Sequence, residues 1–235
     1  GRYADRGAVT WFSLGDRDLA THLFRTQRLA EGATLSTVTA DIAAAWGLAL
    51  RVLPVTEHPL RTRVTLADGE DAGREVSFQD YFVLRRHDVP VESVRFAGSE
   101  AAWPSPGVLE AVTDAAVVVV APSNPIVSIG PVLAVPGVRD AVTARRDHVV
   151  AVSPLVGGRA LKGPADRLLR ELGHESSVVG VARLYAPLAA TLVIDRADAE
   201  HAAAVEAEGL RCVVTDTIMR DPSAAAALGK VVLSR

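Results

Sequence analysis

Residues 116–131 read AVVVVAPSNPIVSIGP, and this stretch decides the fold class. The apolar run at 116–120 has no polar interruption, which is typical of a parallel strand that is buried on both faces of its sheet. Prolines stiffen the loop after it, because proline fixes φ and removes a backbone donor. Open α/β sheets bind ligands beyond the carboxyl ends of their strands, so this loop is a candidate binding site.

The C-terminal half of the chain repeats this alternation of apolar strand and helix. Uninterrupted apolar strands with crossover helices predict an α/β fold, built on a Rossmann-like parallel sheet with helices on both faces. The expected strands lie at 149–152, 192–194 and 212–214, and the expected helices lie at 108–113, 138–143, 165–172 and 197–208.

The first half of the chain has a different pattern. Residues 10–47 contain two helical periodicities; Thr34 and Ser36 are candidate caps of the second, which Gly47 would end. Short β-rich runs separated by turn signals follow and indicate a smaller β-rich insertion. These runs lie at 49–53, 61–66, 76–84 and 91–96. The predicted division is a helical start of the core at 1–47, the insertion at 48–106 and the α/β core at 107–235.

The composition limits the classes of partner and location. The chain has 235 residues, is 49% hydrophobic and carries a formal net charge of −3, so no overall positive field points to nucleic acid. No apolar run approaches the roughly 18 residues of a membrane span, and no signal peptide is visible, so we expect a cytoplasmic protein without a membrane partner. Cys212 is the single cysteine, and it lacks the clustered ligands of a zinc site.

The loop at 121–131 offers hydroxyl and amide groups at Ser123, Asn124 and Ser128. These groups suit a polar ligand, but a rigid turn that caps the next helix uses the same residue types. The residues alone leave both interpretations open. Another polar strand-end loop, at 216–221, is expected to be structural.

The loop at 153–164 also leaves a buried strand and enters a helix. Gly157 and Gly158 permit close backbone approach to a ligand, and Arg159 and Lys162 add positive charge, a combination that favours phosphate. The loop matches neither the Walker A pattern nor the dinucleotide fingerprint. A purely structural turn is the alternative interpretation.

A third polar block lies at a helix start, at 11–22. It brings together Asp16, Asp18, Thr21 and His22. Acidic residues at a helix start commonly cap the helix or interact with its dipole, and this is the alternative to a binding role.

These blocks together resemble one enzyme family. The chain is similar to the 2-phospho-L-lactate transferases, called phosphoenolpyruvate transferases in actinobacteria, over essentially all of its residues. Several motifs in order and at compatible spacing are more specific than any one of them alone. The matching blocks are LGDRDLATH at 14–22, FQDYF at 78–82, PSNPIVSIGP at 122–131, SPLVGG at 153–158, KGPA at 162–165 and TDTIM at 215–219.

The resemblance implies a transferase of coenzyme F-420 biosynthesis. The donor would be guanosine diphosphate esterified to lactate or enolpyruvate, and the acceptor would be Fo, a deazaflavin with a ribityl chain. The terminal ribityl hydroxyl would attack the phosphorus nearer the acid and release GMP. The resemblance also implies magnesium (Mg2+) as the cofactor, and we expect a homodimer by default.

The resemblance assigns two groups of site residues and no catalytic residue. The nucleotide and diphosphate group comprises Ser123, Asn124, Ser128, Gly157, Gly158, Lys162 and Gly163. The acceptor group, which would face Fo, comprises Ser13, Gly15, Asp16, Asp18, Thr21 and His22.

The sequence departs from the family pattern at its front. Relatives open with a strand and a GGxGGA-type loop, then an Asp-Leu-Asp block expected to hold magnesium, and neither motif is in this chain. The metal ligands are therefore expected outside these residues. Two alternatives stay open: a non-catalytic nucleotide-sugar-binding regulator of the related gluconeogenesis-factor group, and a dinucleotide oxidoreductase, for which no GxGxxG is visible. The LGDRDLATH and IVSIGP blocks favour the transferase.

Overall fold

A four-stranded parallel sheet forms the centre of the structure, a computed structural model that describes residues 14–161 and 163–234. The strand order is β4-β5-β8-β9, and each neighbouring pair is parallel. The two central strands are fully buried, whereas the edge strands are partly exposed. The strands are β4 (Val118–Val120), β5 (Val149–Val152), β8 (Thr191–Asp195) and β9 (Arg211–Thr215), which confirms the strands predicted for this half.

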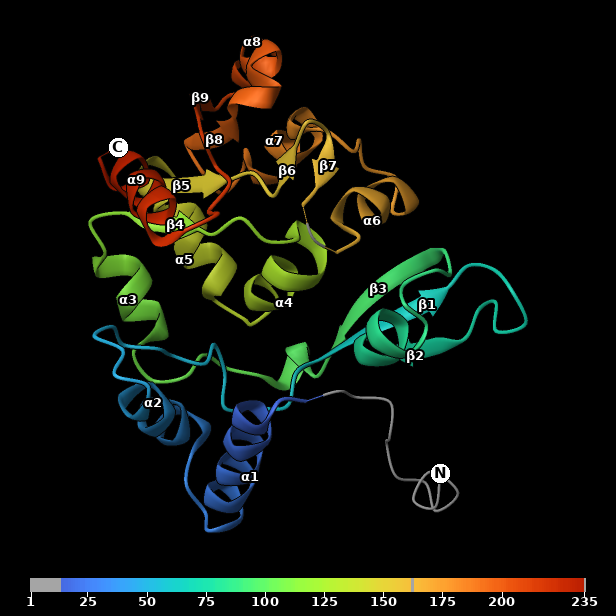
Figure 1. Cartoon of the computed structure of the whole chain (residues 1–235), viewed down its shortest axis with the longest axis vertical. Coiled ribbons are helices and arrows are strands. Elements are labelled where there is room, and N and C mark those ends of the chain that lie inside the picture. Colours follow the sequence, from blue (N-terminus) through green and yellow to red (C-terminus); the bar gives the residue numbers. More distant parts are fainter. Residues whose placement is uncertain (1–13, 162, 235) are drawn as a thin grey trace.

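Helices cover both faces of this sheet, as predicted (Figure 1). Ala151 and Leu192 pack with four of the helices on one face, while Val150 and Val193 pack against the C-terminal helix α9 on the other. Successive strand residues point to opposite faces, so a continuous apolar strand supplies both clusters. The helices are α3 (Val108–Asp114), α4 (Gly130–Leu133), α5 (Val138–Ala144), α6 (Ala165–Glu171), α7 (Val178–Tyr185), α8 (Ala202–Ala207) and α9 (Pro222–Leu233).

Two helical segments differ from the prediction. The single helix expected at 197–208 is a 3-10 helix, Arg196–His201, followed by α8, because Asp198 in the first part is buried and accepts a hydrogen bond from a neighbouring loop. Helix α7 was not predicted; it is only eight residues long, and six of them are buried. A Cβ added to Gly180 of α7 would lie 1.9 Å from the carbonyl oxygen of Glu175. Glycine at this position therefore lets the helix pack closely on the backbone that precedes it.

The insertion contains a three-stranded antiparallel sheet of order β2-β1-β3. Only part of the expected run at 76–84 is a strand; the remainder turns into a π-helix, Asp80–Leu84, because Ser77 Oγ accepts the Asp80 N–H and Tyr81 turns into the core. The run predicted at 49–53 is not a strand, and its Leu50 is exposed. The strands are β1 (Arg61–Leu66), β2 (Glu75–Ser77) and β3 (Val91–Ala97).

The insertion packs against α6 of the core. Leu168 of α6 is fully buried in a cluster with Val64, Leu66 and Tyr81 of the insertion. On the same helix, Glu171 pairs with Arg167 and accepts the N–H of Val91 at 2.9 Å, while Arg167 donates to the carbonyl of His87. These contacts fix the insertion against α6.

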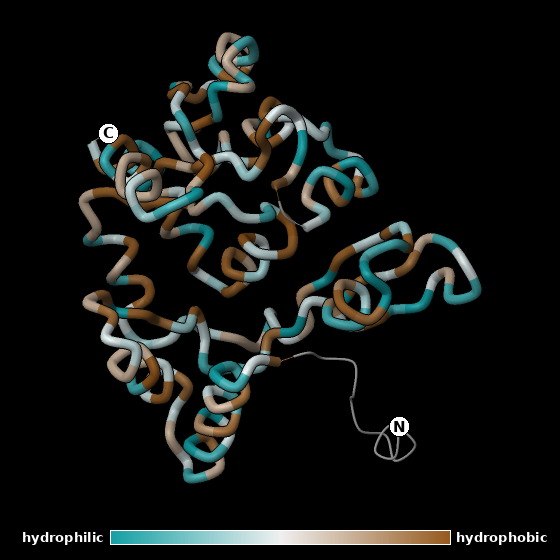
Figure 2. Tube along the Cα trace, in the orientation of Figure 1, coloured by the Kyte–Doolittle hydropathy of each residue, from teal (hydrophilic) through white to brown (hydrophobic). Residues whose placement is uncertain are grey.

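The two N-terminal helices confirm the predicted helical start. They are α1 (Asp16–Ala30) and α2 (Leu35–Ala45). Thr34 caps α2 by accepting the Thr37 N–H at 3.2 Å, and Gly47 follows its end with a φ of +66°. No side chain of α1 is buried; Leu23 is 63% exposed, and Figure 2 shows hydrophobic and hydrophilic residues interspersed along this helix.

In the described part of the chain, no single helix is long and apolar enough to cross a membrane. One pair of consecutive helical segments, Pro125–Leu133 and Val138–Ala144, is together long and apolar enough for a membrane span, but the two segments are bent by 97° relative to each other.

Candidate functional site

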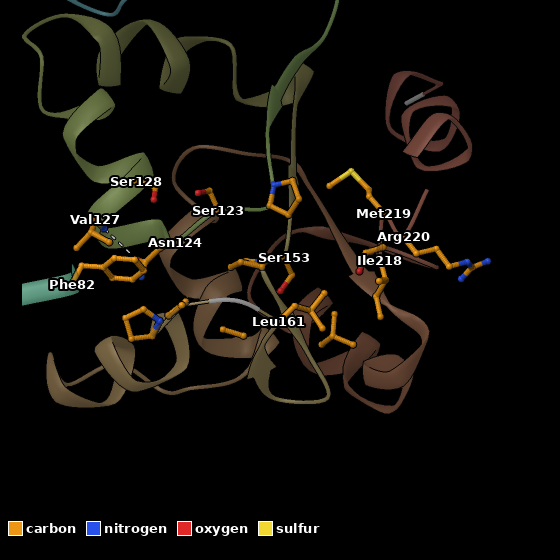
Figure 3. A pocket seen from close by; sticks show the side chains of 18 of the residues that line it. Phe82, Ser123, Asn124, Val127, Ser128, Ser153, Leu161, Ile218, Met219 and Arg220 are labelled. Atoms are coloured by element: carbon orange, nitrogen blue, oxygen red, sulfur yellow. Dashed lines mark hydrogen bonds between the residues drawn. The ribbon is translucent and has the colours of Figure 1, made fainter. Parts of the chain in front are cut away.

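A pocket of about 790 Å³ lies at the carboxyl ends of the parallel strands, where α/β sheets bind ligands (Figure 3). Its volume is within the roughly 300–1,000 Å³ of small-molecule sites. The core contributes Pro122, Ser123, Asn124, Val127, Ser128, Ser153, Pro154, Val156, Ala160, Leu161, Gly163, Pro164, Ala165, Thr217, Ile218, Met219 and Arg220, and the insertion contributes Phe78 and Phe82.

The loop after β4 forms the polar end of the pocket. Asn124 Oδ1 accepts the N–H groups of Ile126 and Val127 at 2.9 and 3.2 Å and so caps a π-helix, Pro125–Ile129. The Nδ2 of Asn124 is buried and has no hydrogen-bond partner among the described residues. The structural interpretation of this loop is therefore confirmed for Oδ1, and the ligand role of Asn124 stays a prediction.

Close packing against the insertion holds this loop in place. A Cβ added to Gly130, which follows the π-helix, would lie 2.8 Å from Cζ of Phe96 in β3. Only glycine allows this approach without displacing the aromatic ring. The loop is therefore fixed both by its own cap and by the neighbouring sheet.

The loop after β5 forms the floor of the pocket. Ser153 is buried, donates its N–H to the Val193 carbonyl at 2.9 Å and accepts the Leu155 N–H on Oγ at 3.1 Å. Its hydroxyl therefore orders the turn that leads into β6 (Leu155–Val156).

Gly157 and Gly158 form the two-residue turn of the hairpin between β6 and β7 (Arg159–Ala160). Their φ angles of +59° and +73° belong to a type I′ turn, in which glycine is strongly favoured. The Gly157 N–H donates to Asp198 Oδ2 at 2.9 Å, and neither glycine lines the pocket. The conformation of the turn accounts for both glycines, and their assignment to phosphate stays a prediction.

The structure brings together four residues of the predicted nucleotide group. Ser123, Asn124, Ser128 and Gly163 all line the pocket. Lys162 lies outside the described residues.

The predicted acceptor block lies on α1 and does not line this pocket. Figure 1 shows α1 apart from the strand ends. Thr21 donates to the Arg17 carbonyl at 2.8 Å, and His22 Nδ1 lies 2.8 Å from an Arg25 nitrogen. The exposed members of the block are Gly15, Asp16, Asp18 and His22, with Thr21 half-buried, and Ser13 lies outside the described residues.

The segment after β9 is a pocket wall that sequence reasoning missed. The Thr217 N–H and hydroxyl donate to Asp195 Oδ2 at 2.8 and 3.0 Å, which turns Ile218 and Met219 toward the pocket. Burial alone would raise the pKa of Asp195, but these bonds and the Ala197 N–H lower that pKa below its ordinary value. The sequence signal for this wall was the polar pair at 216–217 directly after the strand β9.

Phe78 and Phe82 are the second group that sequence reasoning missed. Their rings stack with centroids 5.4 Å apart, and both line the pocket. The FQDYF block marks them in the sequence, but their place beside the strand ends depends on how the insertion packs.

Among the described residues that line the pocket, Arg220 is the one ionisable side chain, and its positive charge can attract an anion. The described pocket lining contains no carboxylate, which is the ligand type that magnesium prefers. No group of three or more His, Cys, Asp or Glu side chains that could hold a metal occurs in residues 14–161 and 163–234. The described residues therefore do not form a magnesium site by themselves.

The fold and the pocket define an α/β protein with a pocket of small-molecule size at the carboxyl ends of a parallel sheet. The family model described as 2-phospho-L-lactate transferase CofD matches residues 2–232. The chain belongs to this family. It is therefore a transferase, as the sequence predicted.

Relatives with curated names agree with this family. The chain is 42% identical to a phosphoenolpyruvate transferase of Kitasatospora aureofaciens, a match covering 95% of this chain and 70% of that one. Identity to the protein of the same name from Streptomyces griseus is 43%, with the same coverage. A phosphoenolpyruvate transferase of Mycolicibacterium smegmatis is 39% identical over 93% of this chain and 67% of its own length.

Solved structures confirm the fold class. A UPF0052-family protein of Bacillus halodurans superposes with a TM-score of 0.61 over 90% of this chain and 70% of that one, at 15% identity. A second crystal structure, of a Bacillus halodurans protein, gives a TM-score of 0.65 over 95% of this chain and 76% of that one, also at 15% identity. At this identity the similarity concerns the fold alone.

Proposed function

We propose that this protein transfers a phosphoenolpyruvyl or 2-phospholactyl group from a GDP-linked donor to the ribityl hydroxyl of the deazaflavin Fo, in coenzyme F-420 biosynthesis. The family match over residues 2–232 carries the proposal. The strand-end pocket supports it, because its polar and apolar walls suit a ligand with both characters. The same family match favours the transferase over the regulator alternative.

The proposed step is a substitution at phosphorus. The terminal hydroxyl oxygen of Fo bonds to the phosphorus that carries the acid, and the bond from that phosphorus to the bridging oxygen breaks. GMP leaves with the bridging oxygen, and the hydroxyl proton passes to solvent. Reactions of this type depend chiefly on positioning and electrostatic stabilisation.

The polar end of the pocket supplies groups that suit the diphosphate. Ser123 and Ser128 carry hydroxyl donors, and the Nδ2 of Asn124, which has no partner among the described residues, carries two more hydrogens. A buried donor without a partner costs about 1–3 kcal/mol, and a phosphate oxygen would relieve that cost. Arg220 adds a positive charge at the other end.

Direct assay tests the proposal. The protein is incubated with Fo, a guanylylated three-carbon acid and magnesium, and GMP and the coupled product are followed by mass spectrometry. We expect one GMP for each product, and loss of turnover when magnesium is chelated. Absence of product with every three-carbon acid, together with tight binding of a nucleotide sugar, would instead support the regulator. Light scattering tests the predicted homodimer, and cell fractionation tests the predicted cytoplasmic location.

A further inference from the structure

Two buried carboxylates lie at the end of the central strand β8. Asp195 is the last residue of β8, and Asp198 lies in the 3-10 helix that follows, Arg196–His201. They are 7% and 3% exposed. A buried carboxylate is costly unless donors surround it, so each of the two is expected to have specific partners. Neither residue lines the pocket, so an effect on the reaction must pass through the groups that they bind.

The Asp195 carboxylate holds the segment that follows β9. Its Oδ2 accepts the N–H and the hydroxyl of Thr217 at 2.8 and 3.0 Å, and its Oδ1 accepts the Ala197 N–H at 3.0 Å. Both oxygens therefore have donors. Thr217 and the two residues after it, Ile218 and Met219, line the pocket, so Asp195 sets the position of this wall.

The Asp198 carboxylate holds the hairpin β6–β7. Its Oδ2 accepts the Gly157 N–H at 2.9 Å, and in residues 14–161 and 163–234 this N–H is the one donor to that carboxylate. Val156 before the turn and Ala160 after it line the pocket. Asp198 thus fixes a second wall of the pocket, and it uses one oxygen rather than two.

The two walls come from strands that are not neighbours in the sheet. The hairpin follows β5 and the other wall follows β9, and β8 lies between these strands in the order β4-β5-β8-β9. The carboxyl end of β8 is therefore the point from which one short segment reaches both walls. Two residues separate Asp195 from Asp198 along the chain, so this segment joins the walls directly.

We propose that Asp195 and Asp198 are positioning residues of the transfer reaction, which together hold the hairpin β6–β7 and the segment 217–219 in one fixed arrangement. The inference rests on the proposed function. Transfer at phosphorus depends on the alignment of the reacting groups, and a displacement of about 1 Å can lower the rate about a hundredfold. Walls that are fixed before the substrates bind reduce the entropy cost of that alignment.

Asparagine substitution gives a different result at the two positions, because its amide has one acceptor oxygen and one donor nitrogen. At position 198 one oxygen is enough to accept the Gly157 N–H. At position 195 both oxygens accept hydrogen bonds, so an amide nitrogen would face the donors of Ala197 or of Thr217. We therefore expect asparagine to replace Asp198 and not Asp195.

The transfer assay measures kcat and KM of each variant after its thermal transition has shown that it is folded. We expect kcat to fall about tenfold in Asp195→Asn and in Asp198→Ala, and to stay within about twofold in Asp198→Asn. The matched control is Glu200→Ala, which removes an exposed acid of the same 3-10 helix and should leave kcat unchanged. Because release of either wall breaks the same alignment, an Asp195→Asn/Asp198→Ala double variant should lose little more rate than Asp195→Asn alone.

Three results would overturn the inference. They are full kcat in folded Asp195→Asn, equal losses in Asp198→Asn and Asp198→Ala, and losses that multiply in the double variant, which would mean two independent anchors. If Asp195→Asn loses its thermal transition, Thr217→Val removes only the hydroxyl bond to Asp195 and gives the same test.

Absence of product from the unaltered protein would overturn the proposed function rather than the role of the carboxylates. Amide hydrogen exchange then tests that role without turnover. We expect faster exchange at 217–219 in Asp195→Asn and at 155–160 in Asp198→Ala, and unchanged exchange of both segments would overturn the inference.

Discussion

Asn124 shows how one side chain can serve the fold and a ligand with different atoms. Its Oδ1 accepts the Ile126 and Val127 N–H groups, whereas its Nδ2 is buried and has no partner in residues 14–161 and 163–234. The sequence left a ligand role and a capping role open as alternatives. The capping role uses Oδ1 and the ligand role would use Nδ2, so one side chain can have both. Variants that change one atom at a time are needed to distinguish the two roles.

Asn124→Asp and Asn124→Ala separate the two roles. Aspartate keeps the capping oxygen but replaces the Nδ2 donor with a negative charge, so we expect GDP to bind at least about tenfold more weakly, while the melting temperature stays within a few degrees. Alanine removes both groups, so we expect the same loss of affinity together with about 0.5–2 kcal/mol of lost stability. Calorimetry and chemical denaturation measure the two effects. Full GDP affinity in Asn124→Asp would show that Asn124 only caps the helix.

The glycines of the β6–β7 hairpin also have two possible roles, one in the turn and one in binding phosphate. Its glycines were assigned to phosphate by resemblance, and the structure gives them positive φ angles that a type I′ turn requires. Asn-Gly is a favoured sequence for such a turn, whereas alanine is strained in it. A turn role and a phosphate role therefore predict different responses to substitution.

Gly158→Ala and Gly157→Asn test the turn. We expect Gly158→Ala to lose about 1–2 kcal/mol of stability, because its φ of +73° is unfavourable for alanine. Gly157→Asn should be nearly neutral, and GDP affinity should stay unchanged in both variants. The readouts are urea denaturation and calorimetry. A folded Gly158→Ala variant that has lost GDP binding would support the phosphate role instead.

The success of sequence reasoning also differs by element. The core strands were predictable because residues such as Val149–Val152 are apolar without interruption, and both of their faces are covered. The strand predicted at 76–84 was wrong in its second half. There Tyr81 enters the core of the insertion from a π-helix, which local β propensity does not predict. Helix α7 is short and six of its eight residues are buried, so it does not alternate with a polar face as a surface helix does.

The pocket belongs to the whole molecule rather than to any one segment. Ser123 and Asn124 were predictable from their place after an apolar strand, since strand ends in a parallel sheet converge. Phe78 and Phe82 were not assigned to the site, because they reach it only after the insertion packs on α6. The pocket therefore depends on the interface between insertion and core.

Substitution of Glu171 tests how strongly the insertion is held against α6. Its carboxylate accepts the Val91 N–H of the insertion and pairs with Arg167 of the same helix, which itself donates to the His87 carbonyl. Glu171→Ala therefore removes one hydrogen bond between α6 and the insertion and the ion pair that orients a second. We expect about 1–3 kcal/mol of lost stability, faster hydrogen exchange in β1 and β3, and unchanged protection of β5 and β8.

The control for Glu171→Ala is Glu75→Ala, which removes an exposed ion pair with Arg95 inside the insertion and should cost at most about 1 kcal/mol. Because loosening the insertion also displaces Phe82 from the pocket wall, Fo affinity should fall in Glu171→Ala and not in the control. Uniformly faster exchange across both sheets would mean that insertion and core unfold as one unit. In that case the insertion would be an inseparable part of the core rather than a docked wall of the pocket.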